Sequence, residues 1–343
     1  MAYKLSPTRV EWMWKSNEDP WNSSQKEDWR SYSDVETAII EEAYQKKLSE
    51  ALIDDYHINF KNSVQISNSN ERNQRPVKRI ERGRSTFEPR LREARFMPSP
   101  IHPSTPFAEQ KFFLGFIGVI FEMFDVNDSN ALAEPANRRL MIKKAAEGII
   151  TEGKLLSKQK EAEWMAQQLL NVIDGTDQQV WECCAHLYTM ESFLYQKMNE
   201  YMRLCGDEKN KALWKSKVHT FGPFGYLLQM LTYSKNYNKF YVYRGANLSD
   251  DLIEKFRQNI GAYLMFPAFT SPSRNRAKAE QFGNVIFIIH TSSLSGNNVA
   301  SFSDYPDEEE TLLNADFNFY IRSCTFDTTK NKWIINISSW EDD

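Results

Sequence analysis

Hydrophobic and polar positions alternate along the chain with two different periods. In the first 80 residues, apolar side chains recur at every second position, as at Val10, Trp12 and Trp14, which predicts half-buried strands around one short helix. From 107 to 231 the period is helical, and we predict helices over 137–147, 157–174 and 179–205. Further strands are predicted over 239–243, 265–269, 285–290, 310–313, 317–322 and 332–337, with a helix over 250–258. The chain is therefore predicted to be an α+β protein.

A proline-rich stretch marks the boundary between the two halves of the chain. Five prolines fall between 83 and 107 without a sustained apolar period, which predicts a linker over 83–106. We therefore expect a small N-terminal domain over 1–82 and a larger domain over 107–343. The larger domain is predicted to consist of a helical lobe over about 107–235 and a sheet over about 236–343.

Composition and charge narrow the class of protein. Hydrophobic residues make up 41% of the 343 residues, which is enough to form real cores. The net charge of −4 is close to neutral, so neither direct nucleic-acid binding nor attraction to a membrane surface is expected. The chain has no apolar run long enough to span a membrane, and its first residues do not resemble a secretory signal. The four cysteines and five histidines show no metal-ligand spacing, so we expect no metal and an intracellular protein, cytoplasmic or nuclear.

The N-terminal aromatic pattern has a known counterpart. Trp12 and Trp29 stand where the two naming tryptophans of a WWE domain fall, and the sequence from Ile40 to Tyr44 matches its helix. The segment resembles a WWE domain over nearly its whole length, with a longer stretch than usual over 21–29. The resemblance implies a half-barrel sheet with one helix.

The best-studied WWE domains bind the iso-ADP-ribose unit of poly(ADP-ribose), and the resemblance implies such a site here. Its expected residues are Trp14, Trp29, Tyr56, Gln65 and Arg75. Their chemistry agrees, because adenine needs a flat apolar wall and amide hydrogen bonds, whereas phosphates need guanidinium groups. Two alternatives stay open: the aromatic residues form the core of a small sheet, or the domain binds a protein instead.

Three short motifs follow in the second half, each at the end of a predicted strand. They are Tyr243-Arg244-Gly245, Phe269-Thr270-Ser271-Pro272-Ser273 and Glu308-Glu309-Glu310. In this order they resemble the motifs of the arginine-serine-glutamate class of ADP-ribosyltransferases, with Pro272 in place of the usual middle threonine. The resemblance implies a helical lobe followed by a mixed split sheet, and NAD as substrate. The absence of a GxGxxG pattern argues against a Rossmann site.

The acidic motif carries the most chemistry. In an extended segment Glu308 and Glu310 share one face and Glu309 the other, so the two carboxylates can divide two tasks. The alternative is a solvated acidic run before an edge strand. By resemblance, Glu310 stabilises the cationic ribose that forms when NAD loses nicotinamide. Glu308 is expected to take the proton of an attacking guanidinium, and in the family a glutamate at this position accompanies arginine as target.

The resemblance also implies roles for the surrounding residues. Arg244 is expected to contact the NAD phosphates, and the Gly245 backbone to meet the carboxamide. Ser271 would hydrogen-bond Glu310, and Phe282 would stack on nicotinamide or simply belong to the core. Phe302 and Tyr305, in the turn before the acidic motif, are candidates for contacting the target protein.

The sequence therefore predicts a mono-ADP-ribosyltransferase that modifies arginine on proteins and is tethered to poly(ADP-ribose) by its WWE domain. Two alternatives stay open: an NAD glycohydrolase that uses water as acceptor, and a catalytically silent protein whose output is recognition. A poly(ADP-ribose) polymerase is disfavoured, because its histidine would stand where Arg244 does.

Overall fold

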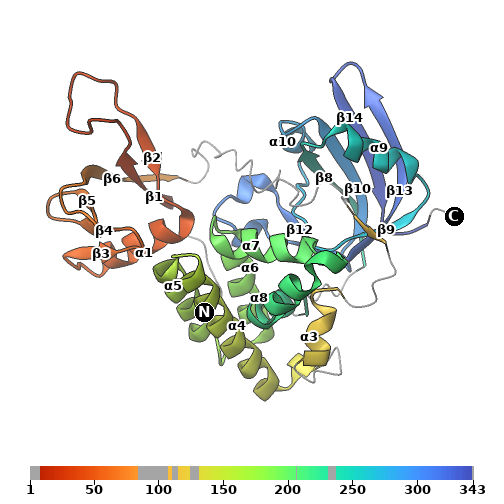
Figure 1. Ribbon diagram of the computed structural model, residues 1–343, viewed down its shortest axis with the longest axis horizontal. Coiled ribbons are helices and arrows are strands. Elements are labelled where there is room, and N and C mark those ends of the chain that lie inside the picture. Colours follow the sequence, from red (N-terminus) through yellow and green to blue (C-terminus); the bar gives the residue numbers. More distant parts are fainter. Residues whose placement is uncertain are drawn as a thin grey trace.

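The computed structural model describes residues 8–83, 107–109, 115–123, 131–205, 207–230 and 237–341. The predicted linker over 83–106 lies outside these residues, except for Gly83 at the end of a strand. An N-terminal sheet domain lies beside one end of a helical lobe, and a second, larger sheet lies on the other side of that lobe (Figure 1). This arrangement confirms the predicted α+β class. None of the helices in the described ranges is long and apolar enough to cross a membrane.

The N-terminal domain is an antiparallel sheet in the order β2-β1-β6-β5-β4-β3 that packs on one helix. Its elements are β1 (Thr8–Lys15), β2 (Trp29–Ser31), α1 (Asp34–Gln45), β3 (Glu50–Leu52), β4 (Tyr56–Asn59), β5 (Val64–Ser67) and β6 (Gln74–Gly83). A capping box between Ser33 and Glu36 fixes the start of α1. Trp12 is buried beside Ile40 and Val77, so it belongs to the core, as the sequence indicates.

The helical lobe contains six α-helices among the described residues. They are α3 (Gly118–Met123), α4 (Pro135–Leu155), α5 (Gln159–Asn171), α6 (Asp177–Thr189), α7 (Phe193–Arg203) and α8 (Lys211–Met230). The prediction of one helix over 179–205 is wrong, because the chain leaves helical geometry at Met190, where φ is −70° and ψ is 144°. The Thr189 hydroxyl donates to the His186 carbonyl at 2.8 Å and satisfies one acceptor at this helix end.

The C-terminal sheet is mixed and has the order β7-β9-β13-β14-β10-β8. Its strands are β7 (Ala108–Glu109), β8 (Lys239–Ala246), β9 (Tyr263–Phe266), β10 (Val285–Ser292), β13 (Phe317–Asp327) and β14 (Lys332–Ser338). Only β10 and β14 pair in parallel among these described strands. Two helices, α9 (Asp250–Gln258) and α10 (Arg276–Ala279), accompany it, and β11 (Gly296–Asn298) with β12 (Thr311–Leu313) forms a separate small sheet. The split sheet that the resemblance implies is therefore present.

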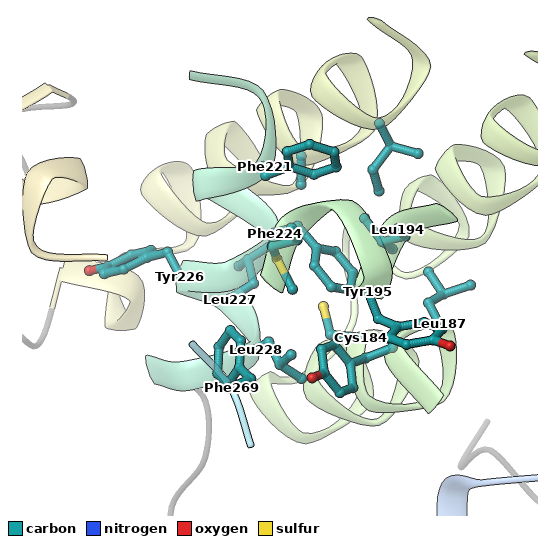
Figure 2. Packing of buried hydrophobic residues seen from close by; sticks show 14 of the residues in the cluster. Cys184, Leu187, Leu194, Tyr195, Phe221, Phe224, Tyr226, Leu227, Leu228 and Phe269 are labelled. Atoms are coloured by element: carbon teal, nitrogen blue, oxygen red, sulfur yellow. The ribbon is translucent and has the colours of Figure 1, made fainter. Parts of the chain in front are cut away.

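The segment after β9 departs from the predicted strand over 265–269. The strand ends at Phe266, and Phe269 turns away from the sheet into the helical core, where its ring lies 5.7 Å from that of Tyr188. Figure 2 shows Phe269 beside Leu228 of α8, within the cluster that also contains Leu227. Beyond Phe269 the segment 270–273 forms isolated bridges to Leu313 and Glu310 on one side and to Tyr243 on the other, so it crosses between the two sheets. Pro272 has no amide hydrogen and cannot donate within this segment.

Candidate active site

The three sequence motifs meet where this crossing segment passes between β8 and β12. Ser273 exchanges two main-chain hydrogen bonds with Tyr243, both of 2.7 Å. On its other side, the Thr311 amide donates to the Pro272 carbonyl at 2.9 Å, and Ser273 bridges Glu310. Main-chain pairing therefore brings the arginine, serine and glutamate segments together, although up to 67 positions separate Arg244 from Thr311.

Arg244 and Gly245 lie on β8, opposite β10. A guanidinium nitrogen of Arg244 donates to the Ser271 carbonyl at 3.3 Å, and the side chain is half-buried. A Cβ atom at Gly245 would lie 2.3 Å from the Ala279 carbonyl oxygen and 2.7 Å from Cβ of Phe282. Only glycine lets the turn after α10 pack this closely, which places the buried Phe282 directly beside the arginine motif.

The acidic motif is not an extended strand, so that expectation is wrong. Glu308 ends a 3-10 helix (Pro306–Glu308), and Glu309 is left-handed with φ of 47° and ψ of 42°. The turn forms because the Glu308 and Glu309 amides donate to the carbonyls of Tyr305 and Pro306, both at 3.0 Å. Strand β12 begins only at Thr311, after the bridge at Glu310.

Glu308 and Glu310 are nevertheless buried while Glu309 is not, so the two outer glutamates of the motif differ from the middle one, as predicted. Glu308 is 5% exposed and Glu310 is 0% exposed. Glu309 points outward, and its carboxylate accepts a hydrogen bond of 3.1 Å from the Asn275 side chain. The structure therefore contradicts the alternative of a solvated acidic run, because two of the three carboxylates are enclosed.

Ser273 has a role that the sequence analysis missed. Its hydroxyl donates to the Glu308 carbonyl at 2.6 Å and accepts from the Asn275 amide at 2.9 Å, and the side chain is buried. It thereby fixes the main chain of the acidic motif. The second serine of the Ser-x-Ser pattern was the available signal. Ser271 itself contacts Arg244 through its carbonyl, and its expected hydrogen bond to Glu310 stays a prediction.

The two expected target contacts lie in different surroundings. Tyr305 is only 5% exposed, and its hydroxyl donates to Asp34 of the N-terminal domain at 2.9 Å. The structure therefore contradicts the expectation that Tyr305 contacts a target protein. Phe302 is half-buried, with its ring 5.2 Å from that of Trp181, and its role in target contact stays a prediction.

Four of the five residues predicted for the WWE ligand site lie on neighbouring strands. Gln65 stands opposite Arg75 in the pairing of β5 with β6, and the Arg75 guanidinium lies 5.6 Å from the Trp14 ring centroid. Arg75 also donates to the Lys15 carbonyl at 3.1 Å and to the Asn17 carbonyl at 2.6 Å, which fixes its orientation.

Tyr32, which the sequence did not single out, lies close to both Tyr56 and Gln65. The Tyr32 hydroxyl donates to the buried Gln65 side chain. Burial raises the pKa of Tyr32, and the nearby Glu36 and Tyr56 raise it further. Tyr32 therefore lies beside Gln65 and near Tyr56, while Arg75 stands opposite Gln65 and close to the Trp14 ring.

Trp29 does not join this group. It pairs with Lys15, whereas the neighbouring Arg30 pairs with Trp14, so Trp29 faces the opposite side of the sheet. On that side the Lys78 ammonium lies 4.1 Å from the Trp29 ring centroid. The assignment of Trp29 to the ligand site is therefore wrong in this structure.

Comparison with known proteins identifies the class. A family model for NAD:arginine ADP-ribosyltransferase matches residues 158–343, and one for the WWE domain matches residues 10–79. The chain therefore belongs to the NAD:arginine ADP-ribosyltransferase family and carries a WWE domain, which confirms both resemblances. NAD is the substrate of this family.

The individual relatives are more distant. The putative NAD(+)–arginine ADP-ribosyltransferase Mav of Mycobacterium avium (strain 104) is 38% identical over 99 residues, which is 28% of this chain and 12% of Mav. The chain thus matches only a small part of that relative. Among solved structures, HopU1 of Pseudomonas syringae pv. Tomato DC3000 is 20% identical, with 51% of this chain and 82% of HopU1 covered and a TM-score of 0.40. The effector XopAI of Xanthomonas axonopodis pv. citri is 14% identical, with coverages of 65% and 98% and a TM-score of 0.42.

Proposed function

We propose that this protein transfers the ADP-ribose group of NAD to arginine side chains of proteins. The observation that carries the proposal is the pair of buried carboxylates, Glu308 and Glu310, held on one short segment beside Arg244. The Arg244 guanidinium suits the NAD phosphates, because its planar donors match phosphate oxygens. Two enclosed carboxylates near such an anchor allow one to face the sugar and the other to face the acceptor.

The reaction breaks the bond between the nicotinamide nitrogen and C1′ of the ribose. The bonding electron pair leaves with nicotinamide, and positive charge grows on the ribose as an oxocarbenium-like centre. The Glu310 carboxylate stabilises that charge, and burial strengthens its effect. A guanidinium nitrogen of the target then attacks C1′ and releases a proton to Glu308, because a protonated guanidinium is a poor nucleophile.

The remaining residues of the site orient NAD. We assign the Gly245 backbone to the carboxamide, Ser271 to the orientation of Glu310, and Phe282 to stacking on nicotinamide. The close packing of Phe282 against Gly245 supports this assignment, because it puts an aromatic ring beside the arginine motif.

We further propose that the WWE domain binds the iso-ADP-ribose unit of poly(ADP-ribose). Trp14, Tyr56, Gln65 and Arg75 supply an aromatic wall, an amide and a guanidinium on neighbouring strands. Adenine and phosphate groups require these donors and surfaces. This binding would bring the enzyme to proteins that already carry the polymer.

One experiment tests the proposal. The purified full chain is incubated with NAD labelled in the ADP-ribose half and a mixed protein substrate, and label on protein is separated from free ADP-ribose. We expect label on protein in a linkage to arginine. Free ADP-ribose alone would instead favour an NAD glycohydrolase, and no turnover would favour a silent recognition protein.

A further inference from the structure

The loop that leads to the acidic motif is held by the N-terminal domain. Tyr305 lies against Arg9 of β1, whose guanidinium carbon is 3.8 Å from the Tyr305 ring centroid. The Tyr305 hydroxyl and the Arg9 guanidinium both donate to one oxygen of Asp34, each at 2.9 Å. All three side chains are buried. We call these three residues the Arg9–Asp34–Tyr305 cluster.

The cluster is also anchored to the helical lobe. The second carboxylate oxygen of Asp34 accepts a hydrogen bond of 2.7 Å from the Glu191 amide, in the turn between α6 and α7. Asp34 therefore joins β1, α1, the lobe and the loop that contains Tyr305. A buried ion pair with this many hydrogen bonds defines one geometry, and removal of either charge leaves the other unpaired in the interior.

Tyr305 lies on the same loop as Glu308 and Glu310 and is hydrogen-bonded to the main chain of Glu308. Its carbonyl accepts from the Glu308 amide at 3.0 Å, which starts the 3-10 turn. Its amide donates to the Ser303 hydroxyl at 3.1 Å, and the Val299 amide donates to the Glu310 carbonyl at 3.0 Å. The hydrogen bond between Val299 and Glu310 thus joins the two ends of the loop over 299–310, and the Arg9–Asp34–Tyr305 cluster holds its middle.

Two other contacts between the domains lie away from this loop. The Asp54 carboxylate accepts from the Lys160 amide at 2.6 Å, at the start of α5. The Trp164 indole donates to Glu42 at 2.9 Å. These contacts join the N-terminal domain to α5 alone, so they provide matched controls that disturb docking without reaching the acidic motif.

We infer that the WWE domain helps to position the transferase site. Arg9, Asp34 and Tyr305 are positioning residues that hold the loop bearing Glu308 and Glu310. This inference rests on the proposed function. The WWE domain then has a second task, independent of any ligand, because it fixes where the two carboxylates stand. Small displacements of catalytic groups reduce rates strongly, since reaction requires closely aligned atoms.

Kinetics of the full chain separate this role from target recognition. Tyr305→Phe removes the hydroxyl and keeps the ring. We expect kcat to fall roughly ten-fold both for NAD hydrolysis without acceptor and for transfer to a small guanidine such as agmatine, with KM for NAD within about two-fold. Trp164→Phe, which loses only the hydrogen bond from α5 to Glu42 of α1, should keep kcat within about two-fold. If Tyr305→Phe raised only KM for a protein acceptor and left NAD hydrolysis unchanged, the positioning role would be refuted.

Hydrogen exchange tests the same inference without any turnover. In Tyr305→Phe, amides over 299–309 should exchange several-fold faster than in the wild type, and adding Arg9→Met should increase exchange no further, because both changes break one cluster. Thermal unfolding checks that each variant is folded. If the variant with Arg9→Met is not folded, the comparison of Tyr305→Phe with the wild type alone tests the inference. Unchanged exchange of the loop would overturn the inference. An inactive wild type with faster exchange in Tyr305→Phe would reject the proposed function and keep the structural link.

Discussion

The two candidate ligand sites of this protein are held together in different ways. In the transferase site, main-chain hydrogen bonds join three separate segments, with Ser273 paired to Tyr243 and Thr311 paired to Pro272. In the WWE domain, the site residues stand on strands of one antiparallel sheet, and pairing register alone places Gln65 opposite Arg75. A site assembled from separate segments depends on each contact that holds a segment. A site on one sheet depends mainly on its own side chains.

The largest effect is expected from removal of one charge in the transferase site. Glu310→Gln keeps the size of the side chain but cannot stabilise a cationic ribose. NAD hydrolysis and arginine transfer should both fall by roughly 10²–10³-fold, as for loss of other groups that stabilise transition-state charge. Steady-state turnover of labelled NAD measures this. Affinity for poly(ADP-ribose) is the internal control and should not change, and full turnover in the variant would remove Glu310 from the mechanism.

In the WWE domain the largest effect is expected at Arg75. Arg75→Ala should weaken binding of iso-ADP-ribose by roughly 10- to 100-fold, because hydrogen bonds to charged groups contribute about 1.5–3 kcal/mol. Titration calorimetry measures the affinity, and thermal unfolding checks that loss of the contact to Lys15 has not unfolded the domain. Arg72→Ala, in the nearby exposed turn, is the matched control. An unchanged affinity would show that the ligand binds elsewhere.

A smaller effect is expected from the hydroxyl that holds the acidic motif. Ser273→Ala leaves the Glu308 carbonyl without its 2.6 Å hydrogen bond. The free energy of unfolding should fall by about 1–3 kcal/mol, the usual cost of a buried group left unsatisfied. Ser216→Ala, whose hydroxyl is exposed, should change it by no more than about 0.5 kcal/mol. Equal stability of the two variants would mean that Ser273 does not hold the motif.

The smallest effect is expected at Trp29. Since its ring faces away from Trp14, Trp29→Ala should leave the affinity for iso-ADP-ribose unchanged. Trp14→Ala should weaken it by about 1–3 kcal/mol if the ring stacks on adenine. The pair of affinities, measured by the same titration, distinguishes the two faces of the sheet. The opposite result would restore Trp29 to the site and reject Trp14.

The residues proposed to carry the chemistry could be found from the sequence, because each motif is short and continuous. Arg244, Ser271 and Glu310 follow one another in the order of the family, and the structure brings their segments together by main-chain pairing. The period of apolar residues likewise predicted α9 over 250–258, where the helix lies. Local patterns sufficed in both cases, since each motif and the helical period can be read within one continuous segment.

The errors at Trp29 and Tyr305 share one physical cause, which is dependence on distant contacts. The register of β2 determines which face Trp29 occupies, and a shift by one residue reverses that face. Tyr305 is buried by Arg9 and Asp34, which are almost 300 and about 270 positions away. The helical pattern continues through Met190 in sequence, but the chain leaves helical geometry there, and the next amide, that of Glu191, donates to the distant Asp34. No spacing within one segment encodes these contacts.

We assign to Glu310 the stabilisation of the ribose cation, and to Glu308 the acceptance of the guanidinium proton. Glu308→Gln tests this assignment through the distribution of ADP-ribose between arginine and water. Labelled NAD is supplied with an arginine-containing acceptor, and arginine-linked and free ADP-ribose are measured in the wild type and the variant. We predict that the variant continues to hydrolyse NAD, while label on arginine falls by roughly 10²-fold, because only the guanidinium acceptor needs this carboxylate. Equal loss of both products, or undiminished label on arginine, would contradict the assignment of Glu308 as the base for arginine.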